Sequence, residues 1–233
     1  MKEKKSAQSN ILILQIDSDG LSLSVYDKPG HLFTSKRIDM EVYKLEIPDL
    51  LAILKEETDF KTEIVEIIVE SYQYSFIPVD IFKIEEATDF LLFEHKPKPT
   101  DSILYNKIPE FGIVNVFAIP GAVLEVVNQL FPKSAIEHHI SRFITENISL
   151  RNENCVYCRA GKTRFDAVVI KNGNIALINS FEYKTPEDFL YFVLNIYDKL
   201  SMNQQKHPVY LQNTIKNPDI ELLLKTYLTT NLL

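Results

Sequence analysis

The chain has 233 residues, a length that suits one large domain or two small ones packed together. Its 25 basic and 32 acidic residues give a formal net charge of −7, and 45% of its residues are hydrophobic. This balance argues against a disordered chain and against a general affinity for nucleic-acid backbones or anionic membranes. Only 6 glycines are present, and a phosphate-cradling loop uses several of them at fixed spacing, so few such loops can be built.

The N-terminus is predicted to be a flexible tail, residues 1–9, that leads into a first strand. The apolar run at 11–16 is too short for a secretion signal, and Asp17 and Asp19 end it without a small-residue cleavage site. The weakly polar stretch at 112–131 is interrupted by a Pro-Gly pair and contains a glutamate. We therefore expect no transmembrane segment.

Alternating hydrophobicity opens the first half and is typical of half-buried strands. Asp19-Gly20 lies between two such runs and predicts a hairpin turn. Apolar residues at helical spacing follow, with Pro48 suited to the first turn of a helix. The predicted elements are strands at 11–16, 21–25 and 32–38, a helix at 47–54 and a buried strand at 64–70.

The middle of the chain combines short strands with helices. An exposed, proline-rich connector at 96–100 separates a first helix from two strands, and Pro132 ends a core-facing helix. A segment at 151–154 is predicted to be a linker. The predicted elements are a helix at 79–90, strands at 102–105 and 113–119, a helix at 121–131, a strand at 135–138 and a helix through 140–144.

The second half repeats the opening arrangement. Asn172-Gly173 predicts a tight hairpin turn, and Thr185 with Asp188 three residues later predicts a capped helix start. The predicted elements are strands at 156–159, 165–170 and 175–183, a helix at 185–200, a strand at 209–212 and a helix at 218–228.

Both halves therefore run strand, strand, strand, helix, strand, helix. Three antiparallel strands followed by helix-linked parallel strands form a mixed five-stranded sheet with helices packed on it. This order is that of the ribonuclease-H-like fold, and two such units form the actin-like ATPase architecture. The predicted fold class is thus α/β with duplicated ribonuclease-H-like units, the first in residues 10–150 with insertions and the second, shorter one in 151–233.

Three segments resemble a bacterial family of uncharacterised proteins with an actin-like ATPase fold. They are ILILQIDSDGLSLSVYD at 11–27, IVNVFAIPGAVLEVVNQLFP at 113–132 and INSFEYKTPEDFLYFVLNIYDKL at 178–200. More distantly, the order of elements resembles the actin-like cytoplasmic proteins of type IV pilus and type II secretion assemblies. The resemblance implies a cytoplasmic location and action through a partner protein or through self-association.

The resemblance also indicates where a nucleotide would bind. An active actin-like ATPase holds phosphate with one hairpin turn in each half and adenosine with a Gly-Gly turn late in the second half. The first turn here contains Asp17, Asp19, Gly20 and Ser22, so its backbone N–H groups could face an anion and Asp17 could hold Mg²⁺ through water. The alternative is a plain hairpin turn, because Asp-Gly is common hairpin chemistry.

The second turn contains Arg159, Gly161, Lys162 and Thr163. The resemblance places Arg159 where an active relative has an aspartate. Such a cluster is suited to binding phosphate but not to polarising a water molecule for hydrolysis. The Gly-Lys-Thr run also resembles the end of a P-loop, but the upstream glycine is missing and a strand is predicted where a helix is required.

Gln212 and Asn213 stand where an active relative has the paired glycines of the adenosine turn, and neither replaces glycine freely. We therefore predict a cytoplasmic, catalytically degenerate actin-like protein, a pseudo-ATPase that needs no cofactor and acts through protein binding or self-association. The alternative is an ATPase or phosphotransferase that uses Mg-ATP in the cleft between the halves, with Asp17 and the turn at 159–166.

Other patterns carry less chemistry. Cys155 and Cys158 are three apart in a predicted strand, so they are interpreted as ordinary cysteines of a reducing cytoplasm that face opposite ways. His138 and His139 are interpreted as a surface pair rather than as metal ligands, because adjacent side chains in a strand diverge. The acidic balance and the lack of a basic face disfavour a nuclease and any nucleic-acid partner.

Overall fold

The structure, a computed structural model, describes residues 11–26, 31–57, 64–148 and 153–233. The predicted tail and the predicted boundary between residues 150 and 151 lie outside these residues. The chain divides into two compact units, unit 1 (Met1–Arg142) and unit 2 (Phe143–Leu233).

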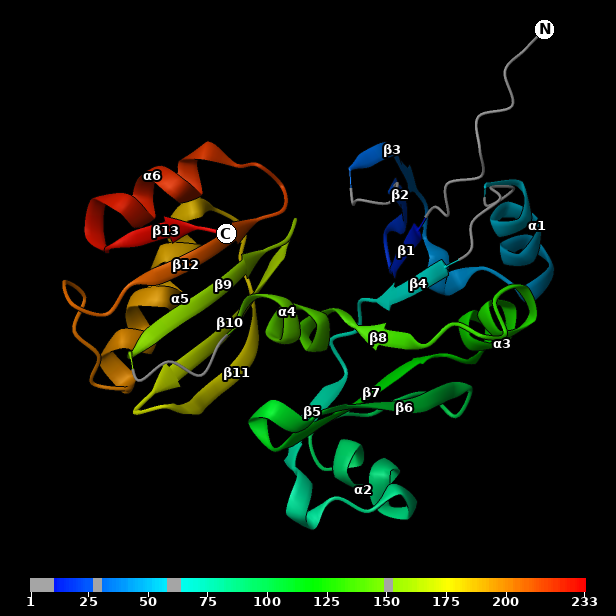
Figure 1. The fold of residues 1–233 in the computed structure, drawn as a ribbon, viewed down its shortest axis with the longest axis horizontal. Helices are drawn as coiled ribbons and strands as arrows, with labels where there is room; N and C mark the ends of the chain where they lie inside the picture. Colours follow the sequence, from blue (N-terminus) through cyan, green and yellow to red (C-terminus); the bar gives the residue numbers. More distant parts are fainter. Residues whose placement is uncertain (1–10, 27–30, 58–63, 149–152) are drawn as a thin grey trace, which may run out of the picture. The chain divides into compact units, whose positions relative to one another are not determined.

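The first sheet of unit 1 has five strands in the order β3-β2-β1-β4-β8 (Figure 1). Strand β2 is antiparallel to both β1 and β3, whereas β4 is parallel to β1 and to β8. This is the arrangement expected from the predicted meander and its parallel continuation. The strands are β1 (Ile11–Asp17), β2 (Gly20–Tyr26), β3 (Leu32–Asp39), β4 (Ile64–Val69) and β8 (Ile136–His138).

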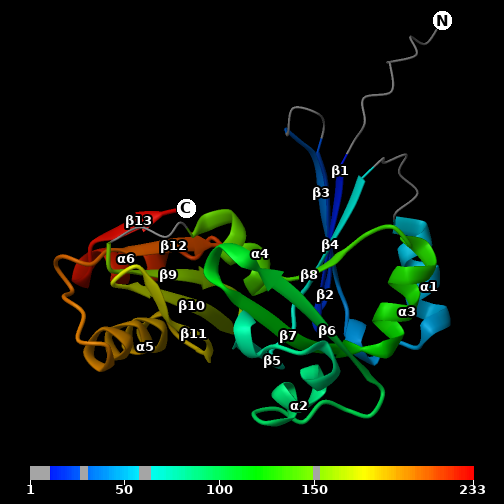
Figure 2. The same ribbon diagram turned by 60° about the horizontal axis from the view of Figure 1, so that its bottom comes forward.

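Two helices, α1 (Ile47–Glu57) and α3 (Gly121–Leu130), lie side by side along one face of this sheet (Figure 2). Each helix buries one apolar stripe, because its apolar residues recur at helical spacing. Alternate residues of β1 are fully buried as well, which leaves Asp17 on the opposite face from Ile16. The fully buried residues of β1, α1 and α3 are Leu12, Leu14, Ile16, Leu50, Leu54, Val126 and Val127.

Between β4 and β8 the chain inserts a second, three-stranded antiparallel sheet and a short helix, α2 (Ala87–Leu92). Its strands are β5 (Tyr74–Pro78), β6 (Asp101–Ile108) and β7 (Ile113–Pro120), in the order β5-β7-β6. The insertion also contains the short 3-10 turns η2 (Val79–Ile81), η3 (Ile84–Glu86) and η4 (Pro109–Phe111). Another 3-10 turn, η1 (Val42–Lys44), precedes α1. The insertion has its own core, made of Ile77, Ala87, Leu91, Val114, Val116 and Ala118.

Asn106 of β6 ties the inserted sheet to β8. Its amide nitrogen donates to the Ile136 carbonyl at 3.0 Å, and its carbonyl oxygen accepts from the His138 N–H at 2.7 Å. The helix α4 (His139–Asn147) follows β8 directly.

Unit 2 repeats the five-stranded order as β11-β10-β9-β12-β13, with the same antiparallel and parallel pairings. The duplicated α/β fold predicted from the sequence is therefore confirmed. The strands are β9 (Cys155–Ala160), β10 (Arg164–Lys171), β11 (Asn174–Glu182), β12 (Val209–Asn213) and β13 (Thr230–Leu232).

The helices of unit 2, α5 (Pro186–Lys199) and α6 (Pro218–Tyr227), share one core with alternate residues of β9, β10 and β12. The predicted helix start is confirmed. Thr185 accepts from the N–H of Asp188, and the Asp188 carboxylate accepts from the N–H of Thr185, which together form a capping box. Cys158 belongs to this core and Cys155 does not, as expected for positions three apart in a strand.

Several details differ from the sequence predictions. The helix predicted at 79–90 is two short 3-10 turns, η2 and η3, followed by α2, and β5 was not predicted as a strand. The closing strand β13 was not predicted, because its three residues carry no alternation long enough to recognise. The first hairpin forms, but Ser18 and Asp19 are its central residues and Gly20 already pairs with Asp17 in the ladder. Glycine is required at 20 for another reason: a Cβ there would lie 2.4 Å from the Ile38 carbonyl oxygen of β3.

Candidate functional site

The first turn is closed by an ion pair between β1 and β3. The Arg37 guanidinium donates to both carboxylate oxygens of Asp17, from Nη1 to Oδ2 at 2.6 Å and from Nη2 to Oδ1 at 3.0 Å. The side chain of Asp17 is only 12% exposed, whereas that of Arg37 is 39% exposed. The hydrogen bonds to Asp17 raise the pKa of Arg37 above its usual range, so the guanidinium stays charged.

The other polar groups of the turn are paired as well. Arg37 donates from Nη1 to Ser22 Oγ at 3.0 Å and from Nε to Asp39 at 3.2 Å, and the backbone N–H of Asp19 donates to Asp17 at 2.9 Å. The structure thus brings Asp17, Asp19 and Ser22 together, with Gly20 between them in the chain. Arg37 uses four of its five N–H groups within this turn.

These residues do not fit a Mg²⁺ ion. Both oxygens of the Asp17 carboxylate accept hydrogen bonds from a cation, and a divalent metal ion at this point would face the guanidinium of Arg37 at short range. Arg37 thus gives the carboxylate a role in holding the turn closed.

The second turn separates the residues that the sequence grouped together. Gly161 donates its N–H to the Arg164 carbonyl at 2.9 Å, so Lys162 and Thr163 form the exposed tip of the hairpin. Arg159 lies further back on β9, where its side chain is 11% exposed and pairs with Asp166 of β10 at 3.3 Å. The predicted phosphate cluster therefore splits into an exposed tip and a buried ion pair.

Asp166 is the centre of that buried pair. Its side chain is 2% exposed, and its second carboxylate oxygen accepts from the Ser180 hydroxyl of β11 at 2.6 Å. Arg159, Asp166 and Ser180 are direct neighbours across three adjacent strands. They form a cross-strand row on the sheet face opposite the α5 and α6 core.

Hydrogen bonding fixes which positions of the two turns are equivalent. The carbonyl of Ile16 accepts from the N–H of Glu70, and the carbonyl of Ala160 accepts in the same way from Thr214. Asp17 therefore corresponds to Gly161, so within this chain Arg159 does not stand at the strand-end position that Asp17 occupies in unit 1. Arg159 corresponds instead to Gln15, one residue before Ile16.

The turn at Gln212 and Asn213, where an active relative has paired glycines, is closed by side chains. The amide nitrogen of Asn213 donates to the Asn217 carbonyl at 2.8 Å and to Glu221 at 2.9 Å, and its oxygen accepts from the Asn217 N–H. Positive φ occurs further along, at Lys216, and not at Gln212 or Asn213. This turn is therefore a side-chain-capped entry into α6.

In each unit a tyrosine hydroxyl donates to a backbone carbonyl at the end of a central strand, β4 in unit 1 and β9 in unit 2. Tyr43 donates to the Glu70 carbonyl at 2.6 Å, and Tyr183 donates to the Gly161 carbonyl. Burial raises the pKa of both phenols, and the nearby carboxylates of Glu70 and Asp17 raise that of Tyr43 further. Both tyrosines therefore act as neutral hydrogen-bond donors.

The histidine pair is buried, so its interpretation as a surface pair is wrong. His138 is fully buried and His139 is 2% exposed. The Nδ1 of His138 accepts from the Ile140 N–H at 3.3 Å, which leaves Nε2 to donate to the Ser71 carbonyl at 2.8 Å. The rings of His138 and Phe117 lie 4.8 Å apart, so the pair fills space between the inserted sheet and β8.

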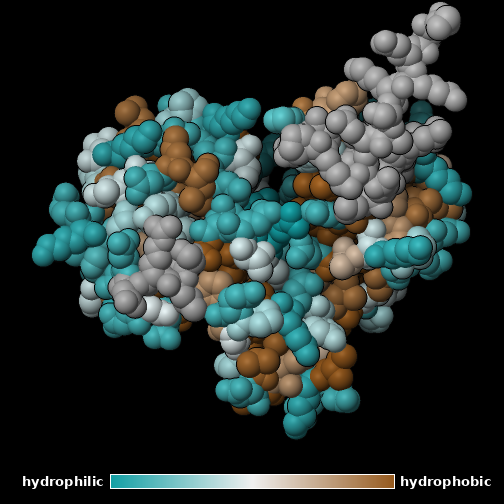
Figure 3. Space-filling view, viewed as in Figure 1, coloured by the Kyte–Doolittle hydropathy of each residue, from teal (hydrophilic) through white to brown (hydrophobic). Residues whose placement is uncertain are grey.

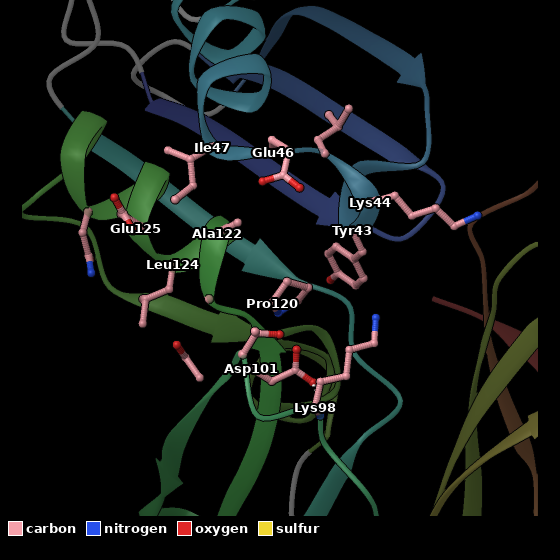
Figure 4. A pocket seen from close by; sticks show the side chains of 15 residues that line it. Tyr43, Lys44, Glu46, Ile47, Lys98, Asp101, Pro120, Ala122, Leu124 and Glu125 are labelled. Carbon is pink, nitrogen blue, oxygen red and sulfur yellow. Dashed lines mark hydrogen bonds between the residues drawn. The ribbon is translucent and has the colours of Figure 1, made fainter.

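A separate cavity of about 830 Å³ lies within unit 1. It is lined by the segment that enters α1, by the loop before β6 and by the start of α3 (Figure 4). Lys44 and Lys98 lie at the end near Tyr43, whereas Leu124 and Glu125 lie at the other. The lining combines apolar side chains such as Ile47 and Leu124 with charged side chains of both signs.

Arg37 was not predicted from the sequence as the partner of Asp17, nor was Asp166 predicted as the partner of Arg159. Arg37 lies on a strand whose side chains are mostly exposed, so nothing in its own pattern distinguishes it from a solvated charge. Asp166 interrupts an apolar strand, and a carboxylate inside such a run signals that a buried partner is needed. That signal could have identified the ion pair with Arg159.

Among the residues that the structure describes, no group of three or more His, Cys, Asp or Glu side chains is placed to hold a metal ion. Within the same part of the chain, every helix is too short or too polar to cross a membrane. Cys155 and Cys158 are buried free cysteines, and burial raises the pKa of the Cys158 thiol well above its usual range.

The chain was compared with known families and structures. A family model described as "Protein of unknown function (DUF3822)" matches residues 1–230, and no curated protein matches the sequence. A Bacteroides thetaiotaomicron protein "with actin-like ATPase fold and unknown function" has a TM-score of 0.80 at 21% identity, with 100% of this chain and 94% of that chain covered. The PilM-PilN type IV pilus biogenesis complex has a TM-score of 0.54 at 12% identity, with 97% of this chain and 87% of that chain covered. The chain thus has the actin-like ATPase fold.

Proposed function

The chain belongs to the DUF3822 family of proteins of unknown function, and we propose that it uses an actin-like ATPase fold to bind another protein without hydrolysing ATP. In this proposal the two ribonuclease-H-like halves, residues 10–150 and 151–233, provide binding surfaces for a partner in the cytoplasm. Fold alone does not determine activity, so the proposal depends on the residues of the turns.

The ion pair between Asp17 and Arg37 carries the proposal. A carboxylate that positions a metal ion for phosphoryl transfer must keep its oxygens available. Here the bidentate guanidinium contact uses both oxygens, with bonds of 2.6 and 3.0 Å. The side-chain-capped turn at Asn213 supports the same conclusion, because its amide is already hydrogen-bonded to Asn217 and Glu221.

Protein binding is supported by two further observations. The similar fold of PilM is known from a complex with PilN, which is a protein partner. Unit 1 also carries the cavity of about 830 Å³ beside α1 and α3, which is large enough to admit side chains of a partner. A homo-oligomer would satisfy the same proposal, with a second copy of the chain as the partner.

Nucleotide titration tests the proposal directly. We expect no rise in melting temperature with millimolar Mg-ATP and no phosphate release above that of heat-inactivated protein. Bound nucleotide at tenfold its dissociation constant would add about 1.4 kcal/mol to the free energy of unfolding, which a thermal-shift assay detects.

The variant Asp17→Asn keeps the shape of the side chain and removes its charge. If purified protein hydrolysed ATP and this substitution abolished the activity, the chain would be an ATPase or phosphotransferase and the proposal would be wrong. Sedimentation velocity of the wild-type protein separately distinguishes a homo-oligomer from a protein that needs a different partner.

A further inference from the structure

The inserted subdomain exposes an unusual concentration of large apolar side chains. Residues 79–94 supply five of the fourteen large hydrophobic residues that are exposed in the part of the chain that the structure describes. Tyr105 on the neighbouring β6 is a sixth. Figure 3 shows apolar atoms grouped among polar ones at the tip of this region. The five residues are Val79 (43% exposed), Ile81 (57%), Ile84 (54%), Leu92 (52%) and Phe93 (92%).

The core of the insertion does not need these side chains. Helix α2 is six residues long and buries Ala87 and Leu91 against the β5-β7-β6 sheet. Leu92 and Phe93 follow on the outward side, at the end of the helix. Because a nearly fully exposed phenylalanine contributes little to folding, its exposure indicates contact with something outside this chain.

The same surface is strongly acidic. Residues 79–94 contain Asp80, Glu85, Glu86, Asp89 and Glu94 against the single base Lys83, a net charge of −4 within a chain whose total is −7. Lys83 is engaged within the surface, because it pairs with Glu86 at 2.7 Å. The acidic–apolar surface, residues 79–94, therefore presents exposed hydrophobic groups inside a negative field.

We propose that the acidic–apolar surface is the docking site for a basic, amphipathic segment of a partner protein. This inference rests on the proposed function and assigns a surface and a partner chemistry to it. Apolar contacts supply the affinity, and the carboxylates select and orient the basic residues of the partner.

The charge argues against the other occupants. An anionic membrane would be repelled by a net charge of −4, although exposed Ile, Leu and Phe side chains could otherwise enter a lipid surface. Two copies of this surface would repel one another face to face, so a symmetric dimer through it is disfavoured. A partner that is both basic and apolar satisfies the two features together.

A synthetic peptide provides the probe. We use the full chain and a peptide of leucine and lysine at helical spacing, and we compare it with a scrambled peptide of the same composition and with a peptide carrying glutamate for lysine. We expect binding of the helical basic peptide alone, with an affinity that falls several-fold when salt is raised from 0.05 to 0.5 M. Vesicles of phosphatidylglycerol serve as the lipid control, and we expect no binding to them.

Paired variants locate the site. Phe93→Ser with Glu85→Lys removes the most exposed apolar group and reverses one charge, and we expect about a tenfold weaker complex with the basic peptide. The matched control, Leu222→Ser with Asp198→Lys, changes an exposed leucine and an exposed acid of unit 2 and produces the same net charge. We expect the control to bind the basic peptide more tightly than the Phe93 and Glu85 double variant. Its affinity should fall below that of wild type only by the amount that its less negative net charge explains. All four positions are exposed, so circular dichroism should report folded proteins.

Each remaining outcome decides the question. Equal losses in the two double variants, equal binding of the scrambled peptide, or binding to vesicles in place of the peptide would overturn the inference. Such a result leaves the proposed function intact if Mg-ATP is still neither bound nor hydrolysed. Hydrolysis of ATP by the wild-type protein would instead overturn the proposed function, whatever the peptide does.

Discussion

The two hairpin turns have the same backbone and opposite placements of charge. In unit 1 the row across the three strands is Gln15, Ser22 and Arg37, and in unit 2 it is Arg159, Asp166 and Ser180. The arginine lies on the third strand in one unit and on the first strand in the other. Arg37 can reach the turn, so it forms its ion pair with Asp17, whereas Arg159 pairs with Asp166, its neighbour in the row.

This difference teaches that the duplicated fold preserves hydrogen-bonding register and not residue chemistry. In each unit the arginine of the row forms an ion pair with a carboxylate of the same unit, Arg37 with Asp17 and Arg159 with Asp166. The pair of unit 1 is partly exposed and the pair of unit 2 is buried. The cost of breaking each pair should therefore differ. Two measurements test that difference, and two more compare other buried groups of the two units.

The largest effect is expected at Asp166. Asp166→Asn removes the negative charge beside Arg159 at a site where both side chains are almost fully buried. We expect a loss of about 3 kcal/mol in the free energy of unfolding, measured by urea denaturation, because an imbalanced buried charge is costly. Asp39→Asn is the control, since Asp39 is 80% exposed and should cost less than about 0.5 kcal/mol. Similar values for the two variants would contradict the contrast between the units.

A smaller effect is expected at Arg37. Arg37→Gln removes the two charge-assisted bonds to Asp17, and we expect a loss of about 1.5 kcal/mol by the same measurement. The neighbouring variant Lys36→Gln breaks an exposed pair with Glu57 and should cost at most about 0.5 kcal/mol. A loss at Arg37 as large as that at Asp166 would mean that exposure does not weaken the first pair.

The pH dependence of stability should also distinguish the units. The folded protein holds Cys158 of unit 2 as a neutral thiol, with its pKa raised by burial, whereas the unfolded chain ionises near pH 9.0. The unfolded state then binds fewer protons, so stability is complete below pH 9 and falls as the pH rises. We expect a loss of about 1.4 kcal/mol between pH 8 and pH 10 from this group.

Cys158→Ala should remove that loss. In unit 1 the corresponding decline comes from Tyr43, whose pKa burial also raises, and it should begin only near pH 10, where an exposed tyrosine ionises. A decline from pH 8 to 10 that survives in Cys158→Ala would assign the effect to another group.

The smallest effect is expected at the two tyrosine caps. Tyr43→Phe removes a hydroxyl hydrogen bond to the Glu70 carbonyl after β4, and Tyr183→Phe removes one to the Gly161 carbonyl after β9. We expect each to cost about 1 kcal/mol in thermal or urea unfolding. A cost near zero in one unit alone would show that the strand end in that unit does not depend on its tyrosine.

The architecture could be predicted because it depends on patterns that are local in the sequence. The Thr185 capping box and the Asn172-Gly173 turn are complete within a few residues, and Asn172 and Gly173 do adopt positive φ. Periodicity likewise identified the long helices and strands of both units. The short strand β13 escaped prediction because its pairing with β12 is not written in its own three residues.

The chemistry of the turns could not be predicted in the same way. Asp17 and Arg37 are twenty residues apart, and their contact depends on β3 pairing with β2 in one particular register. The burial of His138 and His139 depends on the inserted sheet, which is remote in sequence. Candidate site residues were thus recognised individually, whereas their partners required the tertiary structure.

Gly20 has a consequence for how such turns are identified in other sequences. Its lack of a side chain is demanded by the carbonyl of Ile38, which passes 2.4 Å from where a Cβ would stand. Backbone crowding alone can therefore preserve an Asp-x-Asp-Gly signature, whether or not the turn holds phosphate. A motif search should not take this glycine by itself as a marker of ATP binding, because the close approach of β3 to β2 already requires it.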